Sequence, residues 1–389
     1  MTLPRRWQDT ALTDLPHDPS FHHGSHRHLL DRVPARGAGS LDAIVVPTAR
    51  GAVTLREAIL LGLKVGCPVV ALCSQAARAS EATELGQSLG ATVLAIDCDD
   101  VRAIPGFATE ALLEEAGMGS VVDLSLKRNL GLLLARIAGW ERILFLDDDI
   151  FGVNPDDLGG AASLLDNYRA VGLENFGYED NSVVCHAYRA VDGEQDTFIG
   201  GGAMLVAPKN TRSFFPNIYN EDWFFLLGDG VPFKVAVTGR AVQKEYDPFA
   251  TPERAAREEL GDSLAEGIYW LLDNGLGPEH ADSVFWADFL YRRRRLLDDV
   301  LARSESRIAD PVKREKVQAS LRAAKGASSF ITPKICREYV AAWRKDLDLW
   351  GEHLDTFRDQ PSVDKALSEL GLFHRAHRSE YADALFAIR

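Results

Sequence analysis

The chain has 389 residues, 46% of them hydrophobic, which is typical of a globular protein with a sizeable core. Its 57 acidic and 43 basic residues give a formal charge of −14, and this argues against a general nucleic-acid binder, since such proteins carry a basic surface. The five cysteines are scattered without metal-type spacing, so we expect reduced, mostly buried thiols in a cytoplasmic protein.

Residues 1–40 are rich in proline, arginine and histidine and show no helical or strand periodicity. They lack the apolar segment of a signal peptide. His22, His23, His26 and His28 lie close together, but no cysteine or acidic partner completes a closed zinc site, which disfavours a metal-binding role. We expect a mobile or surface-draped extension.

Strands and helices alternate from residue 41 onward. Strands are predicted over 41–47, 68–72 and 92–96, and helices over 53–63 and 74–89. This alternation is typical of right-handed crossover units and a parallel sheet. The longest apolar region, 58–77, is interrupted by a lysine, a glycine and a proline, so it is not expected to span a membrane.

The next helix, predicted over 125–138, leads into the most informative stretch of the chain. Lys127, Arg128 and Asn129 stand at its start. The apolar run 143–146 then has the pattern of a strand buried on both faces. Three consecutive carboxylates follow it directly: Asp147, Asp148 and Asp149. Because parallel sheets bind their ligands beyond the carboxyl ends of their strands, we expect a site at these acids.

Three carboxylates at one strand end repel one another, and a bound cation relieves that repulsion. Oxygen ligands suit hard divalent ions such as Mg²⁺ and Mn²⁺. Cations at a helix start, here Lys127 and Arg128, oppose the helix dipole, and a nearby diphosphate would offset this cost. The alternative is a solvated acidic turn, because aspartate is common after strands.

Residues 154–197 are polar and irregular, with a weak strand signal over 182–188. A glycine triplet, Gly200, Gly201 and Gly202, then borders a strand and indicates the close approach of a backbone or ligand. Its spacing matches neither a phosphate loop nor a dinucleotide-binding motif.

Asn220 is predicted to cap a helix whose first turn holds Glu221 and Asp222. These acids either complement the helix dipole or hold a carboxylate rigidly as a general base.

A strand is predicted over 235–242, and a long helix begins after Thr251 with an apolar stripe from Ala256 to Leu272. The remaining chain is helical and highly charged. Its basic cluster at 291–295 is expected to form a solvated face or a salt-bridged subunit contact. We therefore divide the chain into an extension (1–40), a catalytic domain (41–249) and a helical region (250–389).

Four motifs in this order resemble those of family 2 nucleotide-sugar glycosyltransferases with the GT-A fold. They are the strand and turn 44–50, the basic helix start 127–131 ahead of the acidic strand end 143–149, the glycines of 200–204, and the acids of 220–222. The resemblance covers roughly residues 41–227. It implies an α/β fold with a mostly parallel, GT-A-like sheet flanked by helices, here followed by a helical C-terminal extension.

The resemblance also implies a function: transfer of a sugar from a UDP- or GDP-linked donor to an acceptor hydroxyl. Donor contacts are expected from Pro47, Thr48, Arg50, Asp97, Lys127, Arg128, Asn129, Asp147 and Asp148, and metal contacts to Mn²⁺ or Mg²⁺ from Asp147 and Asp149. The acceptor side is expected at Gly200, Gly201, Gly202 and Trp223. In inverting members the aspartate equivalent to Asp222 is the base, here beside Glu221. The helical C-terminal region is a possible homo-oligomer contact.

The chain departs from the family after its second strand, where Cys73, Ser74 and Gln75 replace the usual acids. Recognition of the base would then fall to Thr48, Arg50 and Asp97. Two other functions stay open. A nucleotidyltransferase uses similar acids and a metal but releases pyrophosphate. A non-catalytic nucleotide-sugar-binding scaffold would use the helical region for interactions.

Overall fold

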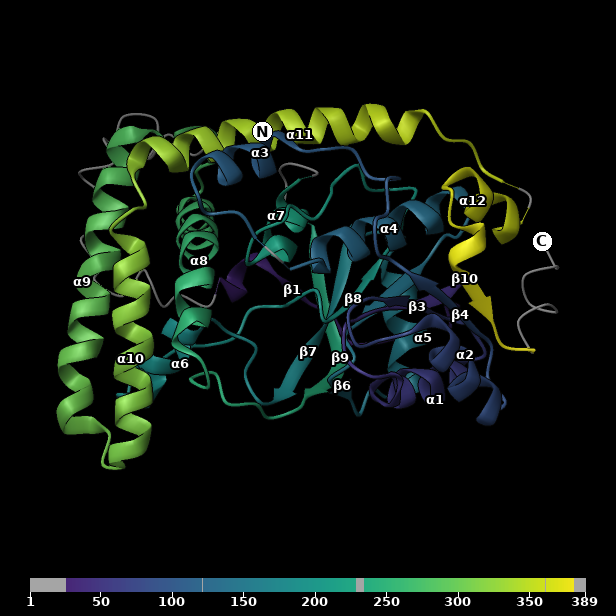
Figure 1. The fold of residues 1–389 in the computed structure, drawn as a ribbon, viewed down its shortest axis with the longest axis horizontal. Coiled ribbons are helices and arrows are strands. Elements are labelled where there is room, and N and C mark those ends of the chain that lie inside the picture. Colours follow the sequence, from purple (N-terminus) through teal and green to yellow (C-terminus); the bar gives the residue numbers. More distant parts are fainter. Residues whose placement is uncertain (1–25, 121, 229–233, 361, 381–389) are drawn as a thin grey trace.

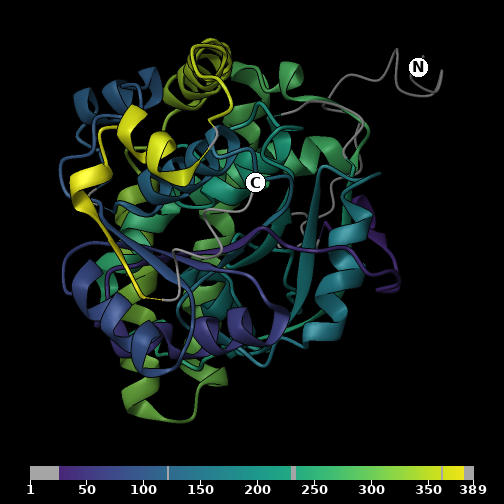
Figure 2. The same ribbon diagram turned by 90° about the vertical axis from the view of Figure 1, so that its right-hand side faces the viewer.

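The computed structural model describes residues 26–120, 122–228, 234–360 and 362–380. Over these ranges the chain is a mixed α/β structure with one ten-stranded sheet, covered by helices on both faces (Figures 1 and 2). The strands are β1 (Asp31–Arg32), β2 (Ala43–Thr48), β3 (Val69–Cys73), β4 (Val93–Asp97), β5 (Ile143–Leu146), β6 (Ile150–Phe151), β7 (Ala170–Gly177), β8 (Ala203–Val206), β9 (Val235–Gln243) and β10 (Ala376–Arg378).

The strand order is β1-β9-β7-β8-β5-β2-β3-β4-β10, and β6 pairs with β9 beside this path. The neighbours from β5 to β4 are parallel, as are β1 and β7 with β9. Strand β8 is antiparallel to β5 and β7, and β10 is antiparallel to β4. The predicted mostly parallel sheet is therefore confirmed. Its central strands end at one edge, which brings the turns after them together.

The α-helices are α1 (Arg56–Val65), α2 (Ala79–Ser88), α3 (Ala108–Glu115), α4 (Leu124–Ile137), α5 (Pro155–Leu164), α6 (Val183–Ala190), α7 (Glu221–Leu227), α8 (Pro252–Asp273), α9 (Ser283–Arg307), α10 (Pro311–Ser328), α11 (Pro333–Asp355) and α12 (Val363–Glu369). Short 3₁₀ turns occur at Arg27–Leu29, Ala52–Leu55, Pro278–His280 and Phe373–Arg375.

Alternate side chains of the central strands enter two separate cores. Val45 and Phe145 pack on the side of α4, whereas Ile44 and Leu144 pack on the side of α1, α2 and α5. Because successive strand residues point to opposite faces, a strand covered on both sides must be apolar throughout. The uninterrupted apolar runs in the sequence follow from this burial.

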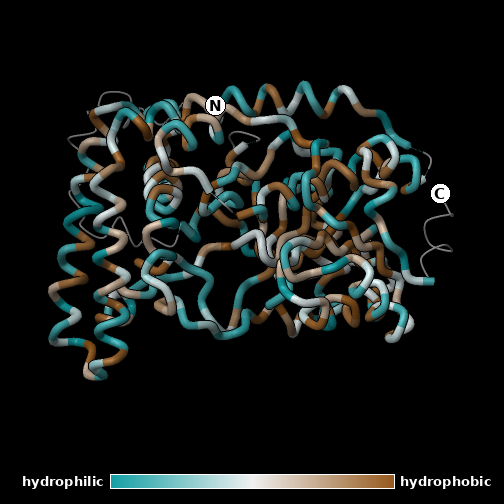
Figure 3. Tube along the Cα trace, viewed as in Figure 1, coloured by the Kyte–Doolittle hydropathy of each residue, from teal (hydrophilic) through white to brown (hydrophobic). Residues whose placement is uncertain are grey.

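The C-terminal helices extend along the main sheet (Figure 1). Helices α9 and α10 form a hairpin at one end of the molecule, and α11 runs across the top to α12 and β10 at the other end (Figure 1). Strand β10 joins the edge of the main sheet beside β4. Hydrophobic and hydrophilic segments alternate along these helices, as expected of amphipathic packing (Figure 3).

The predicted strand over 182–188 is wrong, because this segment forms helix α6. The hydroxyl of Ser182 accepts a hydrogen bond from the Cys185 backbone N–H at 3.2 Å and caps the helix start. Val183, Val184 and Ala187 pack into a core with residues of α9 and α10. Burial of this face outweighs the strand preference of the paired valines.

The described part of the N-terminal extension also departs from the expectation of a draped segment. His26 is 1% exposed, and β1, although its two residues are exposed, pairs with β9 as an edge strand of the sheet. His22 and His23 lie outside the described residues. All five cysteines are buried and free. In the described ranges, no helix combines the length and apolar character that a membrane crossing requires.

Candidate active site

Asp148, the middle aspartate after β5, holds the turn after β2 in place. Its carboxylate accepts hydrogen bonds from the hydroxyls of Thr48 at 2.6 Å and Thr54 at 3.0 Å. It also forms an ion pair with Arg50. Asp148 is buried. The two hydroxyls satisfy its hydrogen-bonding capacity, and Arg50 supplies the opposite charge. This residue therefore joins the ends of two neighbouring strands.

Asp147 points toward helix α4. Both of its carboxylate oxygens lie 3.0 Å from Nη2 of Arg128, a buried residue that also pairs with Glu221. Burial raises the pKa of Asp147, and the neighbouring Asp149 adds to the rise, against the opposing charge of Arg128. One arginine thus links the acidic strand end to the acids that open α7.

Asp149 contacts the turn after β2 through Arg50. Its carboxylate lies 3.1 Å from Nη2 of Arg50, and its backbone carbonyl accepts a hydrogen bond from Lys244 N–H after β9. The side chain of Arg50 is half exposed, at 52%. Arg50 therefore bridges two aspartates at a surface where a ligand phosphate would have access to it.

The glycine triplet lies directly against these charges. A Cβ at Gly201 would lie 2.6 Å from Nη1 of Arg128, and one at Gly202 would lie 3.1 Å from the Asp147 carboxylate. A Cβ at Gly200 would lie 3.0 Å from the carboxylate of Asp180. The close approach that the triplet indicates is present, and any side chain here would push into the charged groups.

Asp222 and Glu221 open helix α7. The Asp222 carboxylate accepts hydrogen bonds from the backbone N–H of Gly201 at 2.6 Å and of Trp223 at 2.8 Å. Asn220 is the N-cap residue by position, but its side chain makes no capping bond and lies 3.4 Å from Asp262. Burial raises the pKa of Glu221 to about 8, even though Arg128 opposes the rise.

These groups share one cavity of about 160 Å³. Its lining includes Arg128, Asp147, Asp180, Gly200, Gly202, Glu221, Asp222 and Trp223. The carboxylates in its wall outnumber the arginine, so the cavity has an acidic lining. Strand β5, the turn before β8 and helix α7 therefore meet at one site.

Asp180 is a site residue that the sequence reasoning missed. Asp180 lines the cavity. Its pKa is raised to about 7, mainly by burial and further by the negative charges of Asp222, Asp147 and Asp149. A carboxyl group that titrates near neutral pH is suited to proton transfer. Asp180 lies in the irregular stretch before α6, where no periodicity marked it.

Four of the predicted donor residues serve the fold in the described structure. The ammonium of Lys127 donates to the Thr48 carbonyl at 2.9 Å, and Asn129 makes two hydrogen bonds to the backbone of Phe215. Asp97 accepts from Ala79 N–H at 3.0 Å at the start of α2. Pro47 is buried in β2. These four do not line the described cavity, and neither do the predicted site residues Thr48, Arg50, Asp148, Asp149 and Gly201.

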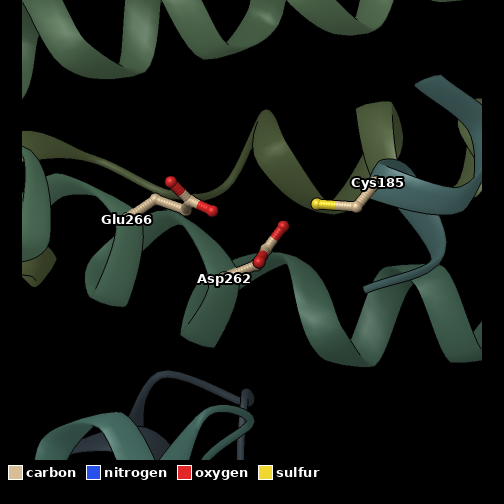
Figure 4. A group of neighbouring side chains, drawn as sticks. All are labelled: Cys185, Asp262 and Glu266. Carbon is tan, nitrogen blue, oxygen red and sulfur yellow. The ribbon is translucent and has the colours of Figure 1, made fainter. Parts of the chain in front are cut away.

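A second acidic group borders the cavity on α8. The thiol of Cys185 and the carboxylates of Asp262 and Glu266 lie within 4.8 Å of one another (Figure 4). Asp262 pairs with Arg293 at 2.6 Å, and Glu266 pairs with His26 at 3.2 Å. Each of these acids already has a cationic partner within the protein, and burial raises the pKa of the thiol, so this group does not call for a metal ion.

Arg293 also corrects an expectation about the basic cluster at 291–295. The prediction of a solvated face or subunit contact is wrong for Arg293. This residue is 0% exposed and pairs with Glu259 at 2.8 Å as well as with Asp262. The predicted apolar stripe of α8 is present at Leu260 and Leu264, but the same helix also buries acids that meet Arg293.

No protein-family model matches the chain, and no curated protein matches it. Among solved structures, it is similar to the mannosyltransferase PcManGT from Pyrobaculum calidifontis, solved in complex with GDP-Man and Mn²⁺. The identity is 14% and the TM-score is 0.44, with 87% of this chain and 93% of that chain covered. A likeness of this size does not identify a function, so the functional argument rests on the site itself.

Proposed function

We propose that the chain is a glycosyltransferase of the GT-A type, which uses a divalent ion to move a sugar from a UDP- or GDP-linked donor to an acceptor hydroxyl. The observation that supports this best is the shared cavity. It joins Asp147 at the end of β5 to Asp222 at the start of α7, with Arg128 and the glycine triplet between them. Donor activation and proton removal would then occur side by side.

Asp147 and Asp149 would hold the Mn²⁺ or Mg²⁺ ion. Their carboxylate oxygens are the ligands that these hard ions prefer. Their side chains are partly exposed, at 28% and 24%, so an ion would have access to them. When bound, the ion would supply positive charge for the departing diphosphate.

The chain's own residues would do the remaining work. Arg50, half exposed beside Asp149, would contact donor phosphate. Asp222, oriented by two backbone N–H groups, would accept the proton of the acceptor hydroxyl as that oxygen attacks the anomeric carbon. Attack opposite the departing diphosphate inverts the configuration. Asp180, close to Asp222 at Gly200, would orient the hydroxyl.

The product distinguishes this function from its alternatives. We expect purified protein with Mn²⁺ to release UDP or GDP from a nucleotide sugar, and to stop doing so when EDTA removes the ion. Release of pyrophosphate from a nucleoside triphosphate and a sugar phosphate would instead establish a nucleotidyltransferase. Thermal stabilisation by nucleotide sugars without any product would favour a scaffold.

Substitution of the base gives a second test. Asp222→Asn should keep donor binding but slow transfer by about 10²- to 10⁴-fold, because the neutral amide cannot accept the proton. Asp180→Asn should slow transfer less. Full loss in Asp180→Asn together with activity in Asp222→Asn would reverse the two roles.

A further inference from the structure

A second cavity adjoins the active-site cavity and has a different chemical character. Its volume is about 290 Å³. Leu124, Tyr219 and Glu221 line both cavities, so the two cavities meet at these residues. Most of its remaining lining comes from the residues around α3 and from α8. A molecule in this cavity would lie next to the acids of the active site.

The side walls of this second cavity are largely apolar. Leu113, Ile218 and Leu260 are buried core residues that also line it, and Met118 packs against the same core. Apolar walls with a few convergent polar groups are typical of small-molecule sites. The volume suits a molecule of modest size.

Two arginines and two glutamates line this cavity, Arg254, Arg257, Glu221 and Glu258, and three of them have ionic partners within the protein. Arg254 donates to Glu258 at 2.6 Å and lies over the ring of Tyr246. Glu258 also accepts from Val183 N–H at 2.8 Å, and Glu221 pairs with Arg128. These pairs cancel.

The remaining cation is Arg257, which is exposed and has no ion-pair partner within the described residues. Arg257 is thus a lining cation whose hydrogen-bond donors are available to a ligand. The guanidinium group binds carboxylates and phosphates through paired hydrogen bonds. Arg257 therefore provides a place for one anionic group.

We propose that this second cavity is the acceptor subsite, and that the acceptor is a small molecule with an apolar part and one carboxylate or phosphate, which Arg257 binds. The hydroxyl of the acceptor then reaches past Tyr219 and Glu221 to Asp222. The assignment of the cavity to an acceptor rests on the proposed glycosyltransferase function, whereas the anion-binding property of Arg257 does not.

The anion-binding property is tested by direct titration. Butyrate and butyl phosphate supply the two anionic groups on a short apolar chain, and butyramide and butanol are their uncharged counterparts. We expect at least one acid to bind the wild-type protein by calorimetry at constant ionic strength, and neither uncharged compound to match it. The tighter of the two acids identifies the group as carboxylate or phosphate.

Variants locate the site. Arg257→Gln should weaken binding of the acid at least about tenfold. Arg337→Gln, an exposed arginine of α11 outside the cavity lining, should leave binding unchanged. The proposal is overturned if neither acid binds, if the uncharged compounds bind equally well, or if Arg257→Gln binds like the wild type. Donor binding, followed separately with UDP or GDP and Mn²⁺, tests the glycosyltransferase function: acid binding without donor binding would reject that function while keeping the anion site.

Discussion

Two acidic clusters reach the same cavity, one through Asp147 and the other through Asp262 and Glu266, and they differ in the exposure of their carboxylates. At the end of β5, the side chains of Asp147 and Asp149 are 28% and 24% exposed and share their arginines with other acids. On α8, Glu259 and Asp262 are 0% and 4% exposed, and both pair with the fully buried Arg293. The first cluster is open to a ligand, and the second is closed within the protein.

This difference separates a functional use of carboxylates from a structural one. A buried carboxylate needs a partner within the protein, because water cannot stabilise its charge. A carboxylate open to a cavity can exchange its arginine contact for a metal ion or a substrate. Proximity of acids alone does not distinguish the two cases, since Cys185, Asp262 and Glu266 are also close together. The two cases are distinguished by which residues carry the opposite charge and by how deeply those residues are buried.

The largest effect is expected from Asp149→Ala in the open cluster. Transfer should fall by about 10³-fold, as for the loss of an important electrostatic group, while the free energy of unfolding changes little because one of several repelling acids is removed. Metal-dependent binding of UDP or GDP, measured by calorimetry, should weaken in parallel. Asp348→Ala, an exposed acid of α11, is the control. Full activity of Asp149→Ala without added metal would contradict the role of the ion.

A substitution in the closed cluster should lower the free energy of unfolding. Arg293→Met leaves Glu259 and Asp262 buried without their cation, so the free energy of unfolding should fall by about 3–5 kcal/mol in urea denaturation. Arg295→Gln, on the exposed side of the same helix, should change it by no more than about 0.5 kcal/mol. Equal effects of the two variants would show that the buried pair is not required.

His26 makes the closed region sensitive to pH. It lies 2.6 Å from Asp273 and 3.2 Å from Glu266, and these partners outweigh burial and raise its pKa to about 9. A raised histidine pKa means that its contribution is complete below about pH 6.5 and is lost as pH rises through 9.

Wild-type protein should therefore lose up to about 3 kcal/mol more stability between pH 6.5 and pH 9 than His26→Gln does. Urea denaturation at both pH values measures this difference. His374→Gln, an exposed histidine, should follow the wild type. A parallel pH dependence of wild type and His26→Gln would contradict the role of His26.

The smallest effect tests the packing that links the glycines to the open cluster. Gly201→Ala places a Cβ near Arg128, which must move away from Asp147 and Glu221. We expect transfer to slow by about ten- to a hundredfold, because misplacement of a charged group by a fraction of an ångström weakens catalysis. Gly326→Ala, in α10 where a Cβ meets no atom within 4 Å, should leave activity intact and stabilise the helix by about 0.5–1 kcal/mol. An unchanged rate of transfer in Gly201→Ala would contradict the expected clash between its Cβ and Arg128.

Local sequence patterns predicted much of the open cluster and its surroundings. The apolar run of β5 and its three acids indicated a strand end at a ligand-binding edge, and the glycine triplet indicated a close approach. Asp180 had no such signal, because it lies in an irregular segment that only the fold places beside Asp222. The acids of α8 recur at three- and four-residue spacing, at 259, 262 and 266. This spacing was a readable sign of one buried helical face, yet nothing local revealed that Arg293 and His26 would meet it.

The sequence by itself determined the alternation of strands and helices and the position of the acids at a strand end, because periodicity and strand burial act over a few residues. The tertiary structure alone decided which charges are open and which are closed. It placed residue 26 against residue 266, and residue 293 against residue 262. It also made a helix of 183–190, through contacts with α9 and α10. Electrostatic pairing and burial depend on distances in space, and residues far apart along the chain set those distances.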